Sequence, residues 1–471
     1  MRLSGFFPLI CVCVLLCVLA CAGATPQHVQ VQNLFDRGDY RAAERAADHA
    51  LARQPGDAAL WRLKIIATLR TGDSARAVAL YMKWHRLRRH YDGEALRAMA
   101  VSTLWRGLGD GSPGVRARAV RLSGRLGAGE LSNAVRARLR DSSDRVAAAA
   151  AFALVTRHAD AKTRALELLS SADSGARVDA IRALGRIGSA DIWRHVEALS
   201  NDADPRVRRA AVMVLRQHRV PGRLSRLVHI ARADSHGSVR TAALRALIGV
   251  ERAIALSSGR RATADPYMGA RLAGVALVAH WPDEHRSELA GLAASSDPYV
   301  ALHAAVALRK AGGDAPVQAV QLALGQRSWT VRVTAVNLLA ELLPRQTALS
   351  FATELLGDPR AEVRLASARV LVGMGQRDRA AEVIAQLLDS PRAEMRVRAA
   401  AALVRMGDER GYRAVTELSR SSRAATRQAA VQVHRHMDRP TLPLVSALGD
   451  RAIEVRIEAA AVLIALLERS R

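Results

Sequence analysis

From residue 108 to the C-terminus, apolar and polar positions recur in long, regular steps. A clear copy of the pattern runs from Asp204 to Leu215, reading DPRVRRAAVMVL. With Val207 as the anchor, equivalent positions follow one another at steps of 29 to 32 residues, and they are Val115, Val146, Ala176, Val207, Val239, Met268, Val300, Val331, Val363, Met395, Thr426 and Val455. The anchor and the residues four and eight places after it share one helical face. The pattern therefore predicts about twelve copies of a helical unit with one buried face.

Two polar columns accompany the anchor. Five places before it stands Asp, Ser or Thr in eleven of the twelve copies, with Gln326 in the twelfth. Such side chains accept hydrogen bonds from the unpaired N–H groups at the start of a helix. One place after the anchor stands Arg in nine copies. Both columns lie at the turn into the second helix of each predicted unit.

These columns resemble those of HEAT repeats, in the short form found in bacterial HEAT-like proteins. The resemblance covers residues 108–471 and implies an all-α fold, an α-solenoid in which helix pairs stack into a right-handed superhelix. It also implies a ladder between neighbouring repeats, formed by the Asp before the second helix and the Arg after the anchor. Because unrelated functions share this architecture, the resemblance says little about function.

A different repeat precedes this region. Gly38-Asp39-Tyr40 and Gly72-Asp73-Ser74 each open a helical pattern, and matching positions in the two copies lie 34 residues apart. This period is typical of tetratricopeptide repeats, whose small residues allow paired helices to approach closely. The second copy departs from that pattern, because Arg89 stands where the closing proline is expected. We expect tetratricopeptide-like helices over residues 25–107.

The first 24 residues have the form of an export signal. Arg2 precedes an uncharged apolar run from Phe6 to Ala20, and small residues follow. Cleavage before Cys21 would leave a lipoprotein, since VLAC resembles a lipobox, whereas Ala22-Gly23-Ala24 is a site for ordinary signal peptidase. A third alternative is a leader that is not cleaved and anchors the chain in the membrane, which would need about twenty apolar residues to span the bilayer. We favour lipidation at Cys21, and thus a lipid-anchored protein of the cell envelope over a soluble periplasmic one.

Candidate catalytic and metal-binding chemistry is sparse. The four cysteines all lie within the first 21 residues, so the rest of the chain can form neither a disulfide nor a Cys-x-x-Cys site. No H-E-x-x-H, phosphate-binding loop or nucleophile elbow occurs. The best metal-site candidate is HWPDEH, from His280 to His285. Pro282 interrupts any helix there, so its two imidazoles have no fixed helical spacing. His434 and His436 would diverge on a helix. We expect no enzyme activity, cofactor or metal.

The chain carries a net charge of +26, with +6 over residues 25–107 and +19 over residues 108–471. Because a solenoid collects one face of every repeat into one groove, this excess can form a basic concave surface. Nucleic acid is therefore an alternative partner, although few aromatic residues accompany the arginines and the leader directs export. HEAT-like proteins also include phycobilisome lyases, so a lyase or a lyase regulator is a second alternative.

The densest basic stretch is YMKWHRLRRHY, residues 81–91. On a helix its aromatic and apolar residues form one stripe and its basic residues the adjacent one. The stretch is either an apolar stripe packed on the next helix, with a solvated basic face, or an edge that binds a partner. The candidate partner-binding residues are Lys83, Trp84, Arg86, Arg89 and Tyr91.

The sequence therefore predicts an exported, noncatalytic scaffold or adaptor. A protein partner would bind along the concave face of the solenoid, where contacts are distributed over many repeats. Attachment to a membrane would come from lipid at Cys21. No small-molecule substrate is indicated.

Overall fold

The computed structural model describes residues 26–126, 129–188, 192–217, 222–314 and 316–469, and within these ranges all regular structure is helical. The all-α, solenoid class predicted from the sequence is confirmed, whereas the handedness of its superhelix stays a prediction. The export signal and Cys21 lie outside the described residues. Among the described helices, none is both long enough and apolar enough to cross a bilayer.

The chain divides into two compact units. Unit 1 combines the residues up to Gly109 with Ser419–Arg471, and unit 2 is Asp110–Leu418. The N-terminal helices and the last repeats of the chain therefore belong to one unit, which the sequence pattern did not indicate. The division of the chain at residues 107 and 108 into two repeat types stays a prediction.

Unit 2 consists of helix pairs. The second helices of the pairs are α7 (Pro113–Leu126), α9 (Asp144–Leu154), α11 (Ser174–Gly185), α13 (Pro205–Gln217), α15 (Gly237–Ala246), α17 (Met268–Val278), α19 (Pro298–Lys310), α21 (Trp329–Leu342), α23 (Ala361–Gly373) and α25 (Ala393–Arg405). The first helices, together with the last helix of the unit, are α8 (Ser132–Ala137), α10 (Ala159–Glu167), α12 (Ile192–Val196), α14 (Arg223–Ala233), α16 (Arg252–Ala262), α18 (Arg286–Ala293), α20 (Val317–Leu324), α22 (Arg345–Glu354), α24 (Arg377–Gln386) and α26 (Glu409–Leu418). Short 3-10 helices adjoin several of them, namely η1 (Gly129–Leu131), η2 (Arg138–Arg140), η3 (Leu168–Ser170), η4 (Glu197–Asn201), η5 (Leu355–Gly357) and η6 (Leu387–Asp389).

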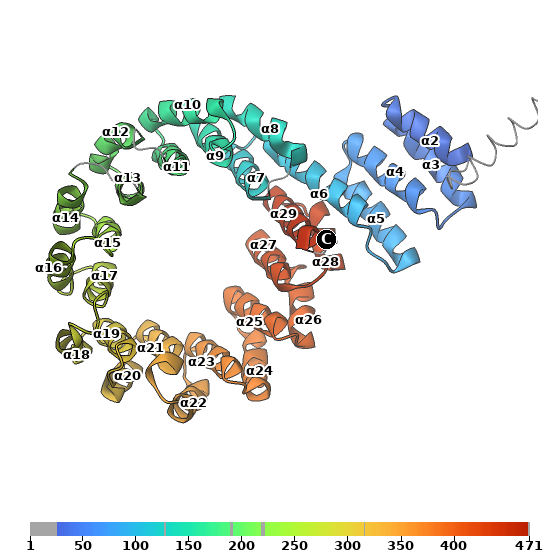
Figure 1. Cartoon of the computed structure of the whole chain (residues 1–471). Coiled ribbons are helices and arrows are strands. Elements are labelled where there is room, and N and C mark those ends of the chain that lie inside the picture. The colour runs from blue at the N-terminus through green and yellow to red at the C-terminus, as the bar shows by residue number, and fades with distance from the viewer. Residues whose placement is uncertain (1–25, 127–128, 189–191, 218–221, 315, 470–471) are drawn as a thin grey trace, which may run out of the picture. The chain divides into compact units, whose positions relative to one another are not determined.

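Within unit 2 the second helices pack side by side in chain order, and the first helices cover them from one side. Figure 1 shows this unit as an arc with the odd-numbered helices α9 to α25 on its inner side and the even-numbered helices on its outer side. We call the solvent-facing side of the odd-numbered helices α7 to α25 the inner face. Each helix pair can bury its apolar stripe only against neighbouring pairs.

The core of unit 2 follows the anchor columns. Val207, Ala211 and Leu215 of α13 are fully buried, as expected for the anchor and the positions four and eight places after it. Alanine dominates these layers because its small side chain lets neighbouring helices approach closely. Helices packed over such small residues depend on fit, so added volume at the crossings is costly.

One predicted repeat is out of register. The sequence pattern predicts Met268 as the anchor, but the Met268 side chain is 41% exposed, whereas Ala270 is fully buried. Arg271, one place after Ala270, contacts the carbonyl oxygens of Asp265 and Pro266 as the other ladder arginines contact theirs. The anchor of this repeat is therefore Ala270, and Asp265 rather than Thr263 is the polar residue five places before it. Met268 and Ala270 are both apolar and lie two places apart, so the sequence pattern does not distinguish them.

Unit 1 is built from both ends of the chain. Its helices are α2 (Pro26–Asp36), α3 (Tyr40–Arg53), α4 (Ala58–Arg70), α5 (Ser74–Arg88), α6 (Gly93–Leu108), α27 (Ala424–Val433), η7 (His434–His436), α28 (Leu442–Ser446), η8 (Ala447–Gly449) and α29 (Ile453–Arg469). Helices α3 and α5 begin 34 residues apart, which is the period seen in the sequence. The last helix, α29, packs along α6. Arg97 of α6 and Glu468 of α29 form an ion pair at 3.6 Å.

Candidate protein-binding surface

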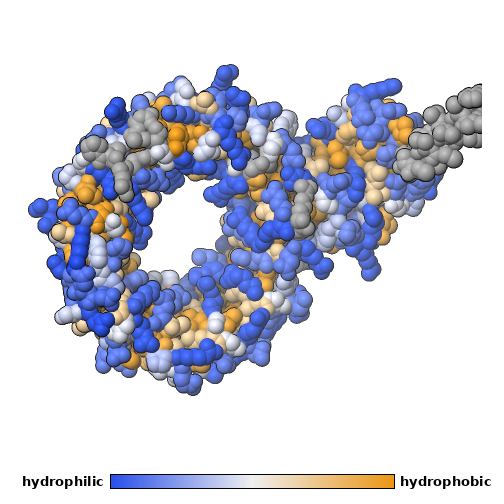
Figure 2. Space-filling model, in the orientation of Figure 1, coloured by the Kyte–Doolittle hydropathy of each residue, from blue (hydrophilic) through white to orange (hydrophobic). Residues whose placement is uncertain are grey.

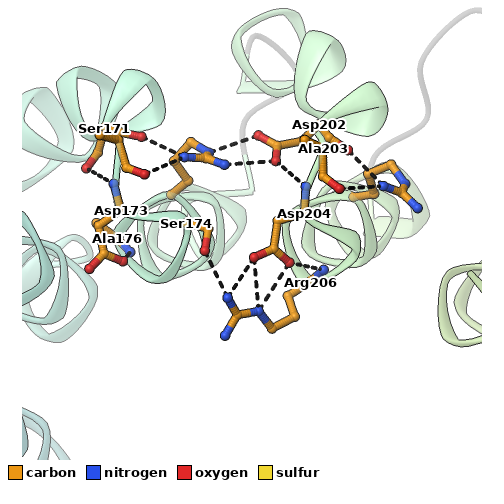
Figure 3. A network of polar contacts seen from close by, with 11 residues as sticks. Ser171, Asp173, Ser174, Ala176, Asp202, Ala203, Asp204 and Arg206 are labelled. Carbon is orange, nitrogen blue, oxygen red and sulfur yellow. Dashed lines mark hydrogen bonds and ion pairs between the residues drawn. The ribbon is translucent and has the colours of Figure 1, made fainter.

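A ladder of arginines and aspartates joins successive repeats. Arg208 donates from Nε and Nη2 to both carboxylate oxygens of Asp234 in the next repeat, each at 2.8 Å. Its Nη1 donates to the carbonyl oxygens of Asp202 and Ala203 in its own repeat, at 2.8 and 3.2 Å. Figure 3 shows the preceding step, in which Asp202 accepts the corresponding pair of bonds. Each such arginine therefore holds two repeats together.

The ladder confirms the pairing that the HEAT resemblance implied. Seven arginines reach an aspartate of the following repeat at closest distances of 2.6 to 2.9 Å, and the pairs are Arg116–Asp141, Arg177–Asp202, Arg208–Asp234, Arg240–Asp265, Arg271–Asp297, Arg332–Asp358 and Arg427–Asp450. Burial acts to raise the pKa of Asp234, but the hydrogen bonds from Arg208 and from the backbone N–H of His236, together with the charge of Arg208, outweigh it, and the pKa lies below its usual value. These arginines are committed to the fold and are not free to bind a partner.

The inner face carries a second set of arginines that the ladder does not use. An odd-numbered helix packs against its neighbours on two sides and against a first helix on a third, so its exposed residues face the inner side of the arc. Six places after the anchor, this column reads Arg121, Phe152, Arg182, Met213, Arg245, Ala276, Val306, Asn337, Arg369 and Ala401. Four of these ten residues are basic and none is acidic, so the middle of the inner face is positively charged.

Like charges are crowded at one end of this face. Burial and the nearby charge of Arg369 on α23 lower the pKa of Arg405 on α25. The two guanidinium groups repel each other, and a bound anion would relieve that repulsion. Figure 2 shows the visible side of unit 2 as mainly hydrophilic, interrupted by separate apolar patches.

A cavity of about 370 Å³ opens where α9, α11 and α13 meet. Its lining includes three large apolar side chains and three basic ones, namely Phe152, Met213, Val214, Arg182, Arg186 and Arg209. Met213 is 42% exposed, which is unusual for a large apolar residue in a solenoid helix. We call this site the Phe152 cavity. It offers an apolar surface beside several positive charges.

Local contacts fix the shape of the Phe152 cavity. Arg186 donates from Nη1 to the carbonyl oxygen of Phe152 at 2.6 Å, and its guanidinium lies 4.9 Å from the centre of the Phe152 ring. A cation over an aromatic face is attracted by the ring quadrupole, so this contact also holds the ring in place. Arg209 forms no ion pair within the described part of the chain, and its side chain is exposed. Its charge is therefore available to a ligand.

One acidic group borders this region. Asp179 of α11 lies 3.3 Å from Arg121 and 3.6 Å from Arg182. Burial raises the pKa of Asp179 even though three arginines, Arg121, Arg182 and Arg145, act to lower it. Asp179 thus partly neutralises Arg121 and Arg182, and it leaves Arg186 and Arg209 as the stronger anion-binding groups.

The candidate residues from the basic stretch lie in unit 1 and divide into two sets. Trp84 is only 2% exposed: its ring stacks on Trp61 with centroids 6.3 Å apart and meets Tyr81 edge-on. It is therefore a core residue and is not accessible to a partner, as expected from the alternative in which an apolar stripe packs on the next helix. Lys83, Arg86 and Arg89 are exposed, and their role in binding stays a prediction.

Tyr91 is half-buried and joins the two chain segments of unit 1. Its hydroxyl accepts a hydrogen bond from the backbone of Leu442, at the start of α28, and burial raises the pKa of the hydroxyl. Arg89 ends α5 in a left-handed conformation, with φ of 52°. The tight turn between α5 and α6 therefore has a structural role that the sequence pattern did not indicate.

The histidine candidates show no ligand-like arrangement. Glu284 pairs with Arg252, and His285 lies 3.6 Å from Glu288. His434 is buried, where its Nδ1 contacts the carbonyl oxygen of Ala430, and burial lowers its pKa. Over the described ranges, no group of three or more His, Cys, Asp or Glu side chains is placed to hold a metal ion.

Sequence reasoning missed the Phe152 cavity. Phe152, Arg182 and Met213 occupy the same column, six places after successive anchors. Reading that column would have shown large side chains at positions that a solenoid leaves exposed. These residues do not form a dense basic run, because they lie about one repeat apart in sequence, so the local sequence pattern did not indicate the cavity.

Comparisons with known proteins agree with the fold. The family model for HEAT repeats matches residues 162–248, 317–403 and 352–435. No curated protein matches the chain.

Solved structures with similarity to the chain have low sequence identity. YibA from E. coli is 15% identical with a TM-score of 0.26, over 66% of this chain and 94% of YibA. The karyopherin Kap121p, bound to the extreme C-terminus of the protein phosphatase Cdc14p, is 13% identical with a TM-score of 0.31, over 88% of this chain and 50% of Kap121p. This chain thus spans about half the length of the Kap121p structure. Human deoxyhypusine hydroxylase in complex with glycerol is 19% identical with a TM-score of 0.23, over 52% of this chain and 96% of the other.

The family match covers repeats in both the first and the second half of unit 2, and the ladder has the arrangement that the HEAT resemblance implied. The chain therefore contains HEAT repeats over residues 162–248 and 317–435.

Proposed function

We propose that this protein is a noncatalytic scaffold that holds a protein partner on the inner face of unit 2. The observation that carries the proposal is the column six places after the anchors, where four arginines and no acidic residue line the exposed side of ten helices. Such a surface suits an acidic partner, because complementary charge speeds encounter and sets orientation. The Phe152 cavity adds a place for an apolar side chain of that partner.

The partner is proposed to be an extended acidic segment with an aromatic or aliphatic residue. Arg186 and Arg209 would bind its carboxylates, and Phe152 and Met213 would contact its apolar side chain. Aromatic and arginine side chains in partly enclosed sites commonly carry much of the binding energy of an interface. Contacts between the partner and many other repeats of the inner face would add to the binding.

The test uses charge reversal on the two sides of the same solenoid. Arg209→Glu, at the Phe152 cavity, is expected to weaken capture of the partner from the native host at least tenfold. Arg379→Glu, on the outer helix α24, makes the same charge change at an exposed residue and should leave capture unchanged. Capture is measured by cross-linking and quantitative mass spectrometry. Equal loss in both variants would contradict a specific inner-face site.

The same preparation separates a protein partner from nucleic acid. A nucleic-acid partner would be retained with the protein, be lost on nuclease treatment and bind with an affinity that falls steeply with salt. A protein partner should survive nuclease treatment. Loss of the captured protein after nuclease treatment would favour the nucleic-acid alternative.

We also propose that the protein is exported and tethered through lipid on Cys21, on the support of the leader and the lipobox-like VLAC sequence. The intact mass of the mature protein from its host should equal the chain from Cys21 onward plus acyl groups. Cys21→Ala should lose that added mass. A free N-terminus at Thr25 would indicate a soluble exported protein, and an intact Met1 would contradict cleavage.

A further inference from the structure

The ladder lacks its aspartate at the step between α23 and α25. At the preceding step Arg332 donates to both carboxylate oxygens of Asp358, at 2.8 and 3.0 Å. In the next repeat Arg364 stands in the same place, but the residue equivalent to Asp358 is Ser390, five places before the anchor Met395. Serine has no carboxylate and is too short to replace one. Arg364 therefore has no acidic ladder partner among the described residues.

Arg364 nevertheless has the conformation of a paired ladder arginine. Its Nη1 donates to the carbonyl oxygens of Asp358 and Pro359 at 2.8 and 3.2 Å, as the Nη1 of Arg332 donates to its own two carbonyls at 2.8 and 3.1 Å. Because the guanidinium is planar, fixing Nη1 also fixes the direction of Nε and Nη2. These two donors face the position that a carboxylate occupies in the other steps.

The backbone around Ser390 is also preserved. Ser390 Oγ accepts a hydrogen bond from the N–H of Arg392 at 3.3 Å, just as Asp358 Oδ1 accepts one from the N–H of Arg360 at 2.8 Å. A cavity of about 330 Å³ remains at this step, with Arg364, Ser390, Gln386 and Pro391 among its lining residues. The ladder geometry is thus kept, and only the carboxylate is missing.

In two other repeats of unit 2 both halves of the ladder pair are missing. Ala147 and Ala301 replace the arginine in two repeats, and the residues that would pair with them are Ser171 and Gln326, neither of which is acidic. Three arginines, Arg271, Arg364 and Arg396, instead have a serine at the position of the aspartate. Asp297 pairs with Arg271 in its place, whereas the position equivalent to Asp297 is Arg392 in the repeat after Arg364, so Arg364 keeps its charge without a ladder counter-charge. An arginine whose fork is directed into a cavity is suited to a planar, bidentate anion.

Other charges at the cavity do not replace the missing carboxylate. Glu362 is 5% exposed and pairs with Arg392 at 2.6 Å. Asp389 also lines the cavity, but no ion pair joins it to Arg364 in the part of the chain that the structure describes. Three arginines, Arg360, Arg364 and Arg392, face these two acidic residues, so the cavity has a net positive charge.

We propose that Arg364 binds a carboxylate supplied from outside the chain, which completes the ladder between α23 and α25. Nε and Nη2 of Arg364 would donate to the two carboxylate oxygens, in the arrangement of Arg332 with Asp358. The site adjoins the ladder rather than the Phe152 cavity, so it does not depend on the inner face binding a protein. Its occupation would stiffen the junction between two neighbouring repeats.

The test compares acetate with chloride at equal ionic strength, using thermal unfolding of the full chain. Acetate is expected to raise the unfolding midpoint of the unaltered protein saturably. Ser390→Asp should supply the carboxylate internally, raise the midpoint without acetate and weaken the acetate response at least tenfold. Ser350→Asp, which adds the same charge at an exposed position on α22, should retain the full response.

Arg364→Gln provides the second variant and should abolish the response to acetate. Should Arg364→Gln fail to fold, Ser390→Asp alone still decides the question. An acetate response that is identical in the unaltered protein and in Ser390→Asp would overturn the proposal. Repeating the experiment with N-acetyl-aspartate amide identifies the source of the carboxylate. Binding of both acetate and N-acetyl-aspartate amide favours an Asp or Glu side chain of a partner, and binding of acetate alone favours a free small acid.

Discussion

At the scale of single residues, the structure depends on how closely its helices approach. A Cβ built on Gly274 of α17 would lie 2.7 Å from the carbonyl oxygen of Gly259 and 2.9 Å from the amide nitrogen of Thr263. Both are backbone atoms of the neighbouring helix or its end, so no side-chain rotation can make room. Gly274 stands four places after the corrected anchor Ala270, where most repeats have alanine. The crossing of α16 and α17 is therefore closer than alanine allows.

Gly274→Ala is expected to destabilise the protein by about 1–3 kcal/mol, because the added methyl group must push two backbones apart. Gly291→Ala in α18 is the matched control, since a Cβ there meets nothing within 4 Å. That change should stabilise by about 0.5–1 kcal/mol, because alanine loses less conformational freedom than glycine in a helix. Urea unfolding of both variants measures the two effects. Equal destabilisation by both would contradict the close approach at Gly274.

At the scale of elements, the ladder shows what the sequence could predict. The columns five places before and one place after the anchor predicted both partners of five of the seven pairs, because a fixed repeat length brings the same positions of successive repeats into contact. The other two pairs, Arg240–Asp265 and Arg271–Asp297, lie outside those columns as they were predicted with Met268 as an anchor. The Met268 register failed because two apolar residues two places apart fit the anchor equally well in sequence. The choice between them depends on the contacts of Arg271 with the carbonyls of Asp265 and Pro266, which only the structure provides.

The ladder also predicts a pH dependence of stability. The pKa of Asp234 is lower in the folded protein than its usual value, because the hydrogen bonds from Arg208 and the His236 backbone, together with the charge of Arg208, outweigh the effect of burial. The contribution of Asp234 to stability is therefore fully present above the unfolded pKa, about 4, and is lost as the pH falls through the lower folded pKa. Asp234→Asn should cost about 1–3 kcal/mol at pH 7, since Arg208 loses its counter-charge.

The difference between Asp234→Asn and the unaltered protein should shrink as the pH falls below about 4. Asp378→Asn removes an exposed carboxylate on the outer helix α24 and should have little effect at any pH. Urea midpoints measured from pH 7 to pH 3 provide the comparison. A difference that stays constant over this range would show that Asp234 does not act through its charge.

At the scale of the whole molecule, the main surprise is the composition of unit 1. Local periodicity predicted the helices at both ends of the chain, but it contains no information about contacts across more than 300 intervening residues. The structure packs α29 along α6 and places η8 against α5, where a Cβ on Gly449 would lie 3.6 Å from Val78. Solenoid repeats ordinarily contact only their sequence neighbours. Here the terminal repeat buries its outer side against helices from the other end of the chain.

This contact makes the stability of α6 depend on the last helix of the chain. Removing residues 453–471 would uncover the surface of α6 that α29 covers, including the region around Gly93, where a Cβ would lie 3.8 Å from Leu467. Amide hydrogen exchange in α6 should then accelerate by at least tenfold, because local protection follows the free energy of local opening. Exchange in α13 of unit 2 should remain unchanged, since its neighbours α11 and α15 are intact. Unchanged exchange in α6 would mean that α29 does not stabilise it, and the N-terminal helices would then form a unit that is stable without the C-terminal repeats.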